Sequence, residues 1–254
     1  MMLAFTGLCV TMALAWNHQP PASAATASSQ SMAVPAYFSP GSEWTEIDHA
    51  DPPVRLAVMN PQNGPGSSRD PGFARAVRAA QSAGVTVVGY VYTDYARRPL
   101  SAVEADVDAY YRWYRVNGIF FDQAPTDCAQ EPYYAALNQY VKGMGGVART
   151  ILNPGTQTSQ CYVHAADILV TFEGSDSEYL RSYSAPAWVA RYAPTHFWHV
   201  IYATATVSAL ARVIQLSQRR RAGFVYVTGS RLPNPYGGLP SDAYWMAELA
   251  DVAS

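Results

Sequence analysis

The sequence carries little charge. Only 14% of its 254 residues are Asp, Glu, Lys or Arg, and the formal net charge is -2. A nearly neutral chain offers no electrostatic attraction to nucleic acid or to an anionic membrane. One basic run, Arg219 to Arg221, falls where a helix is expected to end, and a helix C-terminus favours positive charge without any ligand. We therefore expect neither nucleic acid nor a membrane as a partner of the mature chain.

Several catalytic signatures are also missing. No Gly-x-Gly-x-x-Gly or Gly-Lys-Ser/Thr phosphate loop follows an expected strand, and no Gly-x-Ser-x-Gly motif is present. Among the five histidines, His196 and His199 are three residues apart near a strand, which places them on opposite faces. They would make a poor pair of metal ligands. Nucleotide-dependent, serine esterase and metal-dependent chemistries are thus unsupported, and we expect neither a metal nor a cofactor.

Cysteine is scarce, with three residues in the chain. Cys9 lies in the apolar first segment, which leaves Cys128 and Cys161 as a pair. In an oxidising compartment such a pair can form a disulfide, and two buried free thiols are the alternative.

The first 24 residues resemble an export signal. Leu3 to Trp16 form an apolar segment too short to span a bilayer, and Ala22-Ser23-Ala24 supplies a small-x-small cleavage site. No Lys or Arg precedes the apolar segment, which departs from the usual pattern. We predict a signal peptide over residues 1–24, a flexible leader over 25–32, a catalytic domain over 33–254, and a secreted or cell-surface location.

Eight apolar runs bounded by turn residues are typical of strands, and most are continuous, as in strands covered on both faces. They are Val34 to Phe38, Arg55 to Met59, Val85 to Tyr92, Ile119 to Phe121, Thr150 to Leu152, Ile168 to Phe172, His199 to Tyr202 and Phe224 to Val227.

Segments with helical spacing lie between these runs. They are Pro71 to Ser82, Ala102 to Val116 with Ser101 as its cap, Pro132 to Lys142, Val207 to Arg220 and Ser241 to Val252, with weaker signals near His164 and over Asp176 to Tyr183. Alternating strands and helices in a chain of this length favour a single (β/α)8 TIM-type barrel over an open sheet.

In such a barrel the active site is built where the strands end. Asp122 and Glu173 are acids that end the fourth and sixth expected strands, so their carboxylates should face one cleft. Glycosidic cleavage requires such a pair, one group to protonate the leaving oxygen and one to attack or stabilise the oxocarbenium centre. The alternative is that each acid caps a loop or pairs with an Arg.

Five ordered motifs extend over nearly the whole chain. They are MNPQNGPG at Met59 to Gly66, GVTVVGYVYTDY at Gly84 to Tyr95 with Arg97, GIFFD at Gly118 to Asp122, LNPG at Leu152 to Gly155 and TFEG at Thr171 to Gly174. Together they resemble the signatures of the spherulin-4-like family. The resemblance implies a secreted or cell-surface glycoside hydrolase with a (β/α)8 barrel, acting as an endo-hydrolase on α-1,4-linked exopolysaccharide that contains galactosamine or N-acetylgalactosamine.

The resemblance assigns the family's two strand-end acids to Asp122 and Glu173. At the position after the first, where the family usually has Glu, this sequence has Gln123, which cannot titrate. We expect Glu173 to act as general acid/base and Asp122 as nucleophile or stabiliser, with reversed roles as an alternative. An N-acetyl group of the substrate, oriented by Asp122, could also be the nucleophile.

The remaining candidates lie on the same expected rim and would bind the sugar chain. Aromatic rings can stack on sugars or fill the core, and an Asn before Pro can serve only a turn. The candidate binding residues are Tyr37, Asn60, Tyr92, Asp94, Gln123, Asn153, Tyr202 and Tyr236.

The barrel also bears on the two cysteines, because Cys128 and Cys161 would lie in adjacent loops on the catalytic rim. This placement favours a disulfide that braces the cleft. Three hypotheses remain for the whole chain, which we expect to be a monomer with a polysaccharide partner: an endo-glycoside hydrolase, a non-catalytic polysaccharide-binding barrel, and a structural cell-surface protein.

Overall fold

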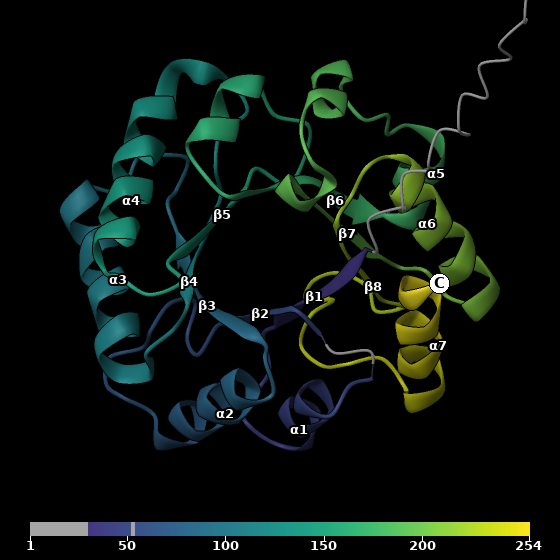
Figure 1. Ribbon diagram of the computed structural model, residues 1–254, viewed down its shortest axis with the longest axis horizontal. Helices are drawn as coiled ribbons and strands as arrows, with labels where there is room; N and C mark the ends of the chain where they lie inside the picture. Colours follow the sequence, from purple (N-terminus) through teal and green to yellow (C-terminus); the bar gives the residue numbers. More distant parts are fainter. Residues whose placement is uncertain (1–29, 52–53) are drawn as a thin grey trace, which may run out of the picture.

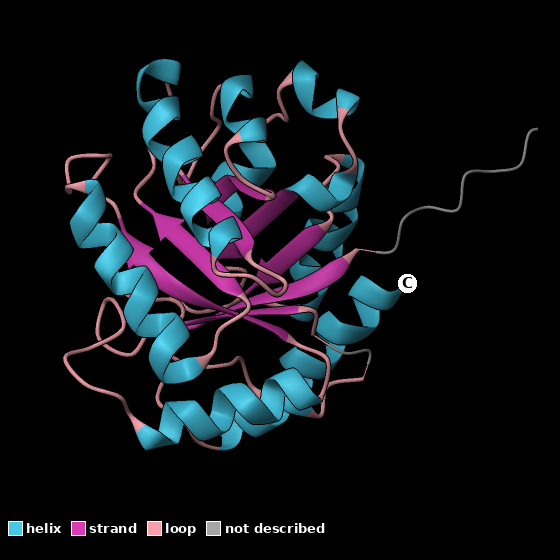
Figure 2. Cartoon of the chain, turned by 60° about the vertical axis from the view of Figure 1, so that its left-hand side comes forward, coloured by secondary structure: helices cyan, strands magenta, loops and turns pink. Residues whose placement is uncertain are grey.

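The computed structural model describes residues 30–51 and 54–254. Eight parallel strands form a closed barrel in sequence order, and β1 pairs with β8 to close it (Figure 1). The helices surround the strands on the outside (Figure 2). The predicted (β/α)8 fold is confirmed. The predicted signal peptide lies outside the described residues.

The strands follow the predicted apolar runs, with small shifts at their ends. They are β1 (Ser31–Ala36), β2 (Leu56–Met59), β3 (Thr86–Tyr92), β4 (Gly118–Asp122), β5 (Arg149–Asn153), β6 (Ile168–Ser175), β7 (Phe197–Tyr202) and β8 (Phe224–Val227). Strand β1 begins two residues inside the segment predicted to be the leader. Strand β6 continues beyond Phe172 and includes Glu173, with a register irregularity between Val170 and Phe172.

The helices are mostly those predicted. They are α1 (Ser42–Asp48), α2 (Pro71–Ser82), α3 (Leu100–Tyr114), α4 (Glu131–Gly143), α5 (Asp176–Arg181), α6 (Val207–Arg219) and α7 (Asp242–Ala253), with short 3-10 helices η1 (Cys128–Gln130), η2 (Gln160–His164), η3 (Ala187–Arg191) and η4 (Pro194–His196).

Two helix starts differ from the prediction. Helix α1 was not predicted, because its seven residues bury only Trp44 and Ile47, too few to reveal a helical period. Ser101 was predicted to cap α3, but this is wrong: the helix begins at Leu100 after Pro99, and no side chain caps it. Proline at this position sets the start of the helix.

The helices pack closely against the barrel. At Gly89 in β3, an added Cβ would lie 2.5 Å from the ring of Tyr110 in α3, so a side chain at this position would push helix and strand apart. Inside the barrel, the rings of Tyr90 and Phe120 stack at 6.1 Å, and Phe120 meets Trp198 edge to face at 5.8 Å. This aromatic layer lies below the rim formed by the C-terminal ends of the strands. None of the described helices has both the length and the apolar character required to cross a bilayer.

The two cysteines form a disulfide, as predicted. Cys128 in η1 and Cys161 in η2 are bonded, with a Cα–Cα distance of 6.0 Å, and the bond joins the loops that follow β4 and β5. These are the loops that follow the strands carrying Asp122 and Asn153, so the bond fixes one wall of the rim.

Removing this disulfide should lower the stability of the protein. It closes 33 residues of chain, and loop-entropy models value a bridge of this size at about 3–4 kcal/mol. We expect the double variant Cys128→Ser/Cys161→Ser to unfold at a lower denaturant concentration than the oxidised wild type. Chemical denaturation measures this, and the wild type treated with reductant is the control. Equal unfolding midpoints would contradict a stabilising role for the bond.

Candidate active site

Asp122 and Glu173 are brought together by one amide. Asp122 ends β4, Glu173 lies near the end of β6, and Asn153 ends β5 between them. The Asn153 side-chain amide donates to Asp122 Oδ1 at 2.9 Å and to Glu173 Oε2 at 2.6 Å. The separation of these two oxygens therefore cannot exceed the sum of 2.9 and 2.6 Å. The parallel register, which pairs Asp122 with Asn153, produces this arrangement.

Two tyrosines bind the outer oxygens of the same carboxylates. Tyr90 Oη donates to Asp122 Oδ2 at 2.6 Å, and Tyr236 Oη donates to Glu173 Oε1 at 2.8 Å. Tyr90 comes from β3 and Tyr236 from the loop between β8 and α7. Each carboxylate is thus held at both oxygens, one by a tyrosine and one by the shared amide. Fixed donors of this kind hold side chains in one orientation for chemistry.

Burial shifts the protonation of both acids. Desolvation raises the pKa of Glu173, and the neighbouring Asp122 charge raises it further, while the bonds from Asn153 and Tyr236 lower it. Desolvation also raises the pKa of Asp122, against the lowering effect of Tyr90, the Gln123 N–H and Asn153. Burial therefore raises the pKa of both acids, and the charge of Asp122 adds to the shift only on Glu173.

Tyr37 lies between the two tyrosines. Its ring meets Tyr90 edge to face at 5.5 Å and Tyr236 at 5.8 Å. Burial raises the pKa of Tyr37, and the charges of Asp122 and Glu173 add to the shift. Tyr37, Asn153 and Tyr236, all three predicted from their place on the rim, therefore surround the carboxylate pair.

Gln123 follows Asp122 in an uncommon backbone conformation. Its φ of 57° is in the left-handed region, where non-glycine residues are infrequent. The turn aims its N–H at the Asp122 carboxylate, while its carbonyl accepts from the Tyr95 N–H at 2.9 Å. Within the described part of the chain, its side chain makes no hydrogen bond. Gln123 is therefore beside the pair, with its amide free to meet a ligand.

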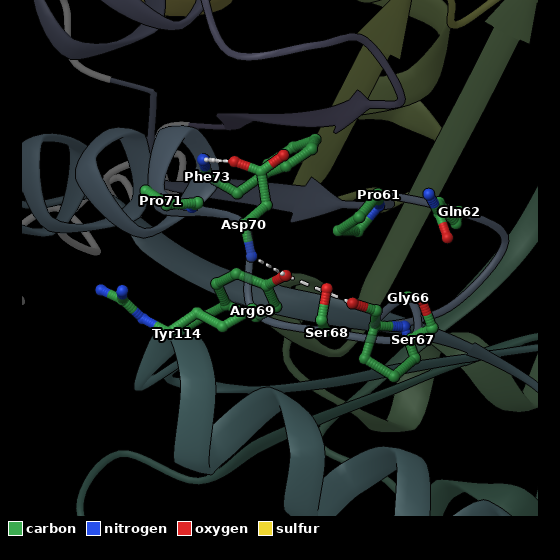
Figure 3. Close-up of a pocket in the computed structure, with 11 residues that line it drawn as sticks. Pro61, Gln62, Gly66, Ser67, Ser68, Arg69, Asp70, Pro71, Phe73 and Tyr114 are labelled. Carbon is green, nitrogen blue, oxygen red and sulfur yellow. Dashed lines mark hydrogen bonds between the residues drawn. The ribbon is translucent and has the colours of Figure 1, made fainter.

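Other predicted binding residues serve the loops instead of the carboxylates. Asn60 Oδ1 accepts from the Gly64 N–H at 3.0 Å, which makes it a turn residue. Its loop lines a separate cavity of about 230 Å³ beside the start of α2 (Figure 3). That cavity includes Asp70 and Tyr114 but neither catalytic candidate, so Asn60 is not placed at the carboxylate pair.

Asp94 and Tyr92 are also engaged by arginines. Asp94 accepts two bonds from the Arg97 guanidinium, at 3.1 and 2.5 Å, in an exposed ion pair. The Tyr92 ring lies 4.2 Å from the Arg98 guanidinium carbon, and Arg98 also binds the Tyr92 carbonyl. Neither residue bonds to Asp122 or Glu173 in the described structure. Their position at a strand end correctly predicted that Asp94 and Tyr92 lie at the rim, but it did not predict that they contact arginines.

Tyr90 is the site residue that the sequence analysis missed. Tyr92 was predicted because it falls at the end of the strand, and in the structure it pairs in register with Asp122. Tyr90 lies two residues earlier on the same face, and its hydroxyl extends up to Asp122. The sequence signal that could have identified Tyr90 is the pair of tyrosines two residues apart at the end of this apolar strand, because both point to the same face.

The loops that follow β3, β4 and β5 form one hydrogen-bonded frame with strand β6 around the pair. Besides the Tyr95 to Gln123 bond, the Ala124 N–H donates to the Asn153 carbonyl at 3.0 Å, and the Glu173 N–H donates to the Gly155 carbonyl at 3.2 Å. A cavity of about 490 Å³ opens beside Glu173 on the β6 side of this frame. Tyr202, at the end of β7, has its pKa raised by burial and by the charges of Glu178 and Glu173. Tyr202 ends its strand, as predicted, and pairs in register with Ser175 of β6.

The described residues contain no group of three or more His, Cys, Asp or Glu side chains placed to hold a metal ion. The groups that the described structure places at the rim are two close carboxylates, the amides of Asn153 and Gln123, and several phenols.

Comparison with known sequences identifies the family. Residues 31–252 match the family described as "Spherulation-specific family 4". The chain is 32% identical over 208 residues to Spherulin-4 of Physarum polycephalum, covering 77% of this chain and 62% of that relative. The chain thus spans less than two thirds of the length of this curated relative.

Comparison with solved structures finds proteins that share the barrel fold. The structure of Aspergillus clavatus Sph3 in complex with GalNAc matches with a TM-score of 0.76 and 26% identity, covering 89% of this chain and 98% of that one. A chitinase catalytic domain from Pyrococcus furiosus (TM-score 0.54, 10% identity, 89% and 98% covered) and a glucosidase from Croceicoccus marinus (0.53, 13%, 89% and 67%) share the fold. With the five motifs in order, the barrel and the match over residues 31–252, the chain belongs to the spherulin-4-like family.

Proposed function

We propose that the protein is an endo-acting glycoside hydrolase that cleaves α-1,4-linked polysaccharide containing galactosamine or N-acetylgalactosamine. The observation that carries the proposal is the pair Asp122 and Glu173, bound to one Asn153 amide at the rim of a carbohydrate-active barrel. The sugar type is supported by the family and by the GalNAc in the structure of the Sph3 relative. Export is proposed from the apolar N-terminal segment and from the disulfide.

In this mechanism Glu173 is the general acid. Its raised pKa keeps it protonated at a pH where an ordinary Glu is ionised, so it can donate to the leaving glycosidic oxygen. Asp122, whose carboxylate form is favoured by the bonds from Tyr90, the Gln123 N–H and Asn153, faces the anomeric centre as nucleophile, or orients the N-acetyl group that attacks in its place. After the leaving sugar departs, Glu173 removes a proton from the incoming water. The Tyr90 and Tyr236 hydroxyls hold both groups in position through these steps.

The separation of the carboxylates supports a stereochemical prediction. Retaining glycosidases place their two carboxyl groups about 5–5.5 Å apart, whereas inverting enzymes need about 6.5–9.5 Å to admit water between them. The two oxygens bound to Asn153 lie no farther apart than the upper limit of the shorter range, and well below the longer one. We expect the product to keep the anomeric configuration of the substrate, whether Asp122 or the N-acetyl group attacks. Proton NMR of the first product formed measures this, and initial release of the β-anomer would contradict it.

The second candidate, a polysaccharide-binding barrel without turnover, rests on Gln123. An uncharged residue stands here where the family usually has Glu. Release of reducing ends from a galactosamine-rich polymer by the wild type, together with direct binding to the same polymer, separates the hypotheses. Turnover supports the hydrolase and binding without turnover supports the second candidate. Neither activity nor binding would leave a structural role for the barrel.

A further inference from the structure

The cavity of about 490 Å³ beside Glu173 is lined by hydrogen-bond acceptors and aromatic rings. It lies between the loop after β5 and the segment that includes α5. The lining residues used in the argument are Gln157, Phe172, Glu173, Glu178, Ser182 and Tyr183. Lys, Arg and His are absent from the residues that line it. Because Glu173 is both a wall of this cavity and one of the paired acids, a sugar bound here would adjoin the bond to be cleaved.

One carboxylate oxygen of Glu178 accepts hydrogen bonds from Ser175, and the other accepts none among the described residues. Glu178 is the third residue of α5, and its Oε2 accepts from the Ser175 N–H at 2.9 Å and from Ser175 Oγ at 2.8 Å. These bonds lower the pKa of Glu178, so it is ionised at neutral pH. Within residues 30–51 and 54–254, its Oε1 accepts no hydrogen bond, and the side chain has no Lys or Arg within ion-pair distance. An oriented, uncompensated carboxylate therefore borders the cavity.

The backbone at Gly174 makes room for this carboxylate. An added Cβ at Gly174 would lie 3.1 Å from Glu178 Oε2 and 2.8 Å from the Phe172 ring. Glycine next to Glu173 thus allows the Glu178 carboxylate and the Phe172 ring to approach the strand. Gly174, which directly follows Glu173 in the chain, is therefore in close contact with the Glu178 carboxylate.

Two other polar side chains of the cavity, those of Gln157 and Tyr183, already make hydrogen bonds within the protein. The Gln157 amide nitrogen donates to the Ser184 carbonyl, which leaves its Oε1 as an acceptor. Tyr183 Oη is paired with the ring of His199 at 3.1 Å. The Arg220 guanidinium, 5.2 Å from the centre of the Tyr183 ring, binds the Tyr179 carbonyl and does not line the cavity. A ligand rich in N–H donors and positive charge matches this lining.

We propose that this cavity is a sugar subsite in which Glu178 binds the ammonium group of an unacetylated hexosamine. Glu178 Oε1 and the Gln157 carbonyl accept from the ammonium, and the rings of Phe172 and Tyr183 provide the apolar wall that a sugar face requires. An acetylated hexosamine has no charge and gains nothing from Glu178. The subsite would therefore direct cleavage towards bonds next to a free amine. This inference rests on the proposed function and adds the chemistry of one flanking sugar.

The experiment compares one polymer in two states. A partly deacetylated α-1,4-galactosaminoglycan is assayed as prepared and after re-N-acetylation, at a mildly acidic pH where the amine is protonated. The variant Glu178→Gln removes the charge but keeps the capping of α5, because Gln serves at this position of a capping box. The variant Asp176→Asn is the matched control, because it removes a carboxylate from the same turn of α5 and Asp176 does not line the cavity.

We expect Glu178→Gln to raise KM for the free-amine polymer about fivefold, the size of a partly exposed ion pair, and to change KM for the re-acetylated polymer by less than about twofold. Equal effects on both polymers, or the same discrimination loss in Asp176→Asn, would overturn the subsite. Binding of short oligomers of both kinds is measured in parallel. If the wild type cleaves neither polymer, the proposed function fails, and charge-dependent binding that disappears in Glu178→Gln still supports the subsite. Charge-independent binding, or no binding, overturns it.

Discussion

Replacing Glu173 by Gln is expected to reduce kcat on the polysaccharide by about 10²- to 10⁴-fold, the contribution of a positioned general acid. Gln has the same shape and can still accept from Tyr236, but it has no proton to give to the leaving oxygen. Because the change leaves the contacts of bound sugar in place, KM should change much less than kcat. Reducing-end assays give both constants. A variant that retains more than about a tenth of wild-type kcat would contradict the role of Glu173.

The pH dependence of the wild type supplies a second readout. The acid must be protonated to act, and burial raises the pKa of Glu173 above the ordinary value of 4.5. Activity should therefore persist above that value and fall as pH rises through the raised pKa. Glu173→Gln should lack this alkaline limb in whatever activity remains. A limb at the same pH in the variant would assign it to another group.

Stability provides the control for this variant. A carboxyl whose pKa is higher in the folded than in the unfolded chain binds more protons when folded, so it costs stability as pH rises through that interval. Glu173→Gln removes this cost. Its melting temperature at neutral pH should be no lower than that of the wild type, and a clear fall would mean that lost activity reflects lost folding.

Replacing Asp122 by Asn is expected to reduce kcat by about 10³-fold or more, because a charge aimed at the developing cation contributes at least as much as one oxyanion-hole donor. The variant keeps the shape of the side chain beside Tyr90 and Asn153. It loses the negative charge needed for attack on the anomeric centre or for orientation of an N-acetyl group. Single-turnover kinetics measures the loss. Near-normal kcat would exclude the two-carboxylate mechanism.

Gln123→Glu is the matched control for Asp122→Asn. It adds the acid that the family usually has, one residue further along the chain. Because the Gln123 side chain bonds to neither carboxylate in the described structure, we expect kcat to change by less than about tenfold, against the much larger effect at Asp122. A gain of about 10²-fold or more in Gln123→Glu would show that a third acid is required, and that the natural sequence is adapted to binding.

The barrel could be predicted because its signals are local. The continuous apolar run Val85 to Tyr92 is typical of a strand that is buried on both faces, and the amphipathic segment Pro71 to Ser82 is typical of a helix that is buried on one face. Both patterns can be recognised from the order of residue types alone. The ends of the elements were less certain. Helix α1 is too short to show a period, and the capping of α3 depends on Pro99 instead of Ser101.

The candidate site could be predicted only in part. Asp122, Asn153 and Glu173 were found because strand ends of a barrel meet at one rim. Tyr90 was missed because its role depends on how far a side chain reaches from one pleat below. Asn60 and Asp94 share the same sequence signal as Asn153, yet they bind a turn and an arginine. Which strand-end residue faces the centre depends on rotamer and register, which sequence position alone does not define.

The sequence by itself determined the fold class, the two acids at the strand ends and the family, and it favoured a disulfide between Cys128 and Cys161 over two free thiols. Each depends on residue type and order along the chain. Only the tertiary structure decided that one Asn153 amide binds both carboxylates, that burial and the Asp122 charge raise the pKa of Glu173, and that Glu178 borders a cavity beside it. These properties depend on distance and desolvation between groups from different strands, and such quantities exist only once the barrel has closed.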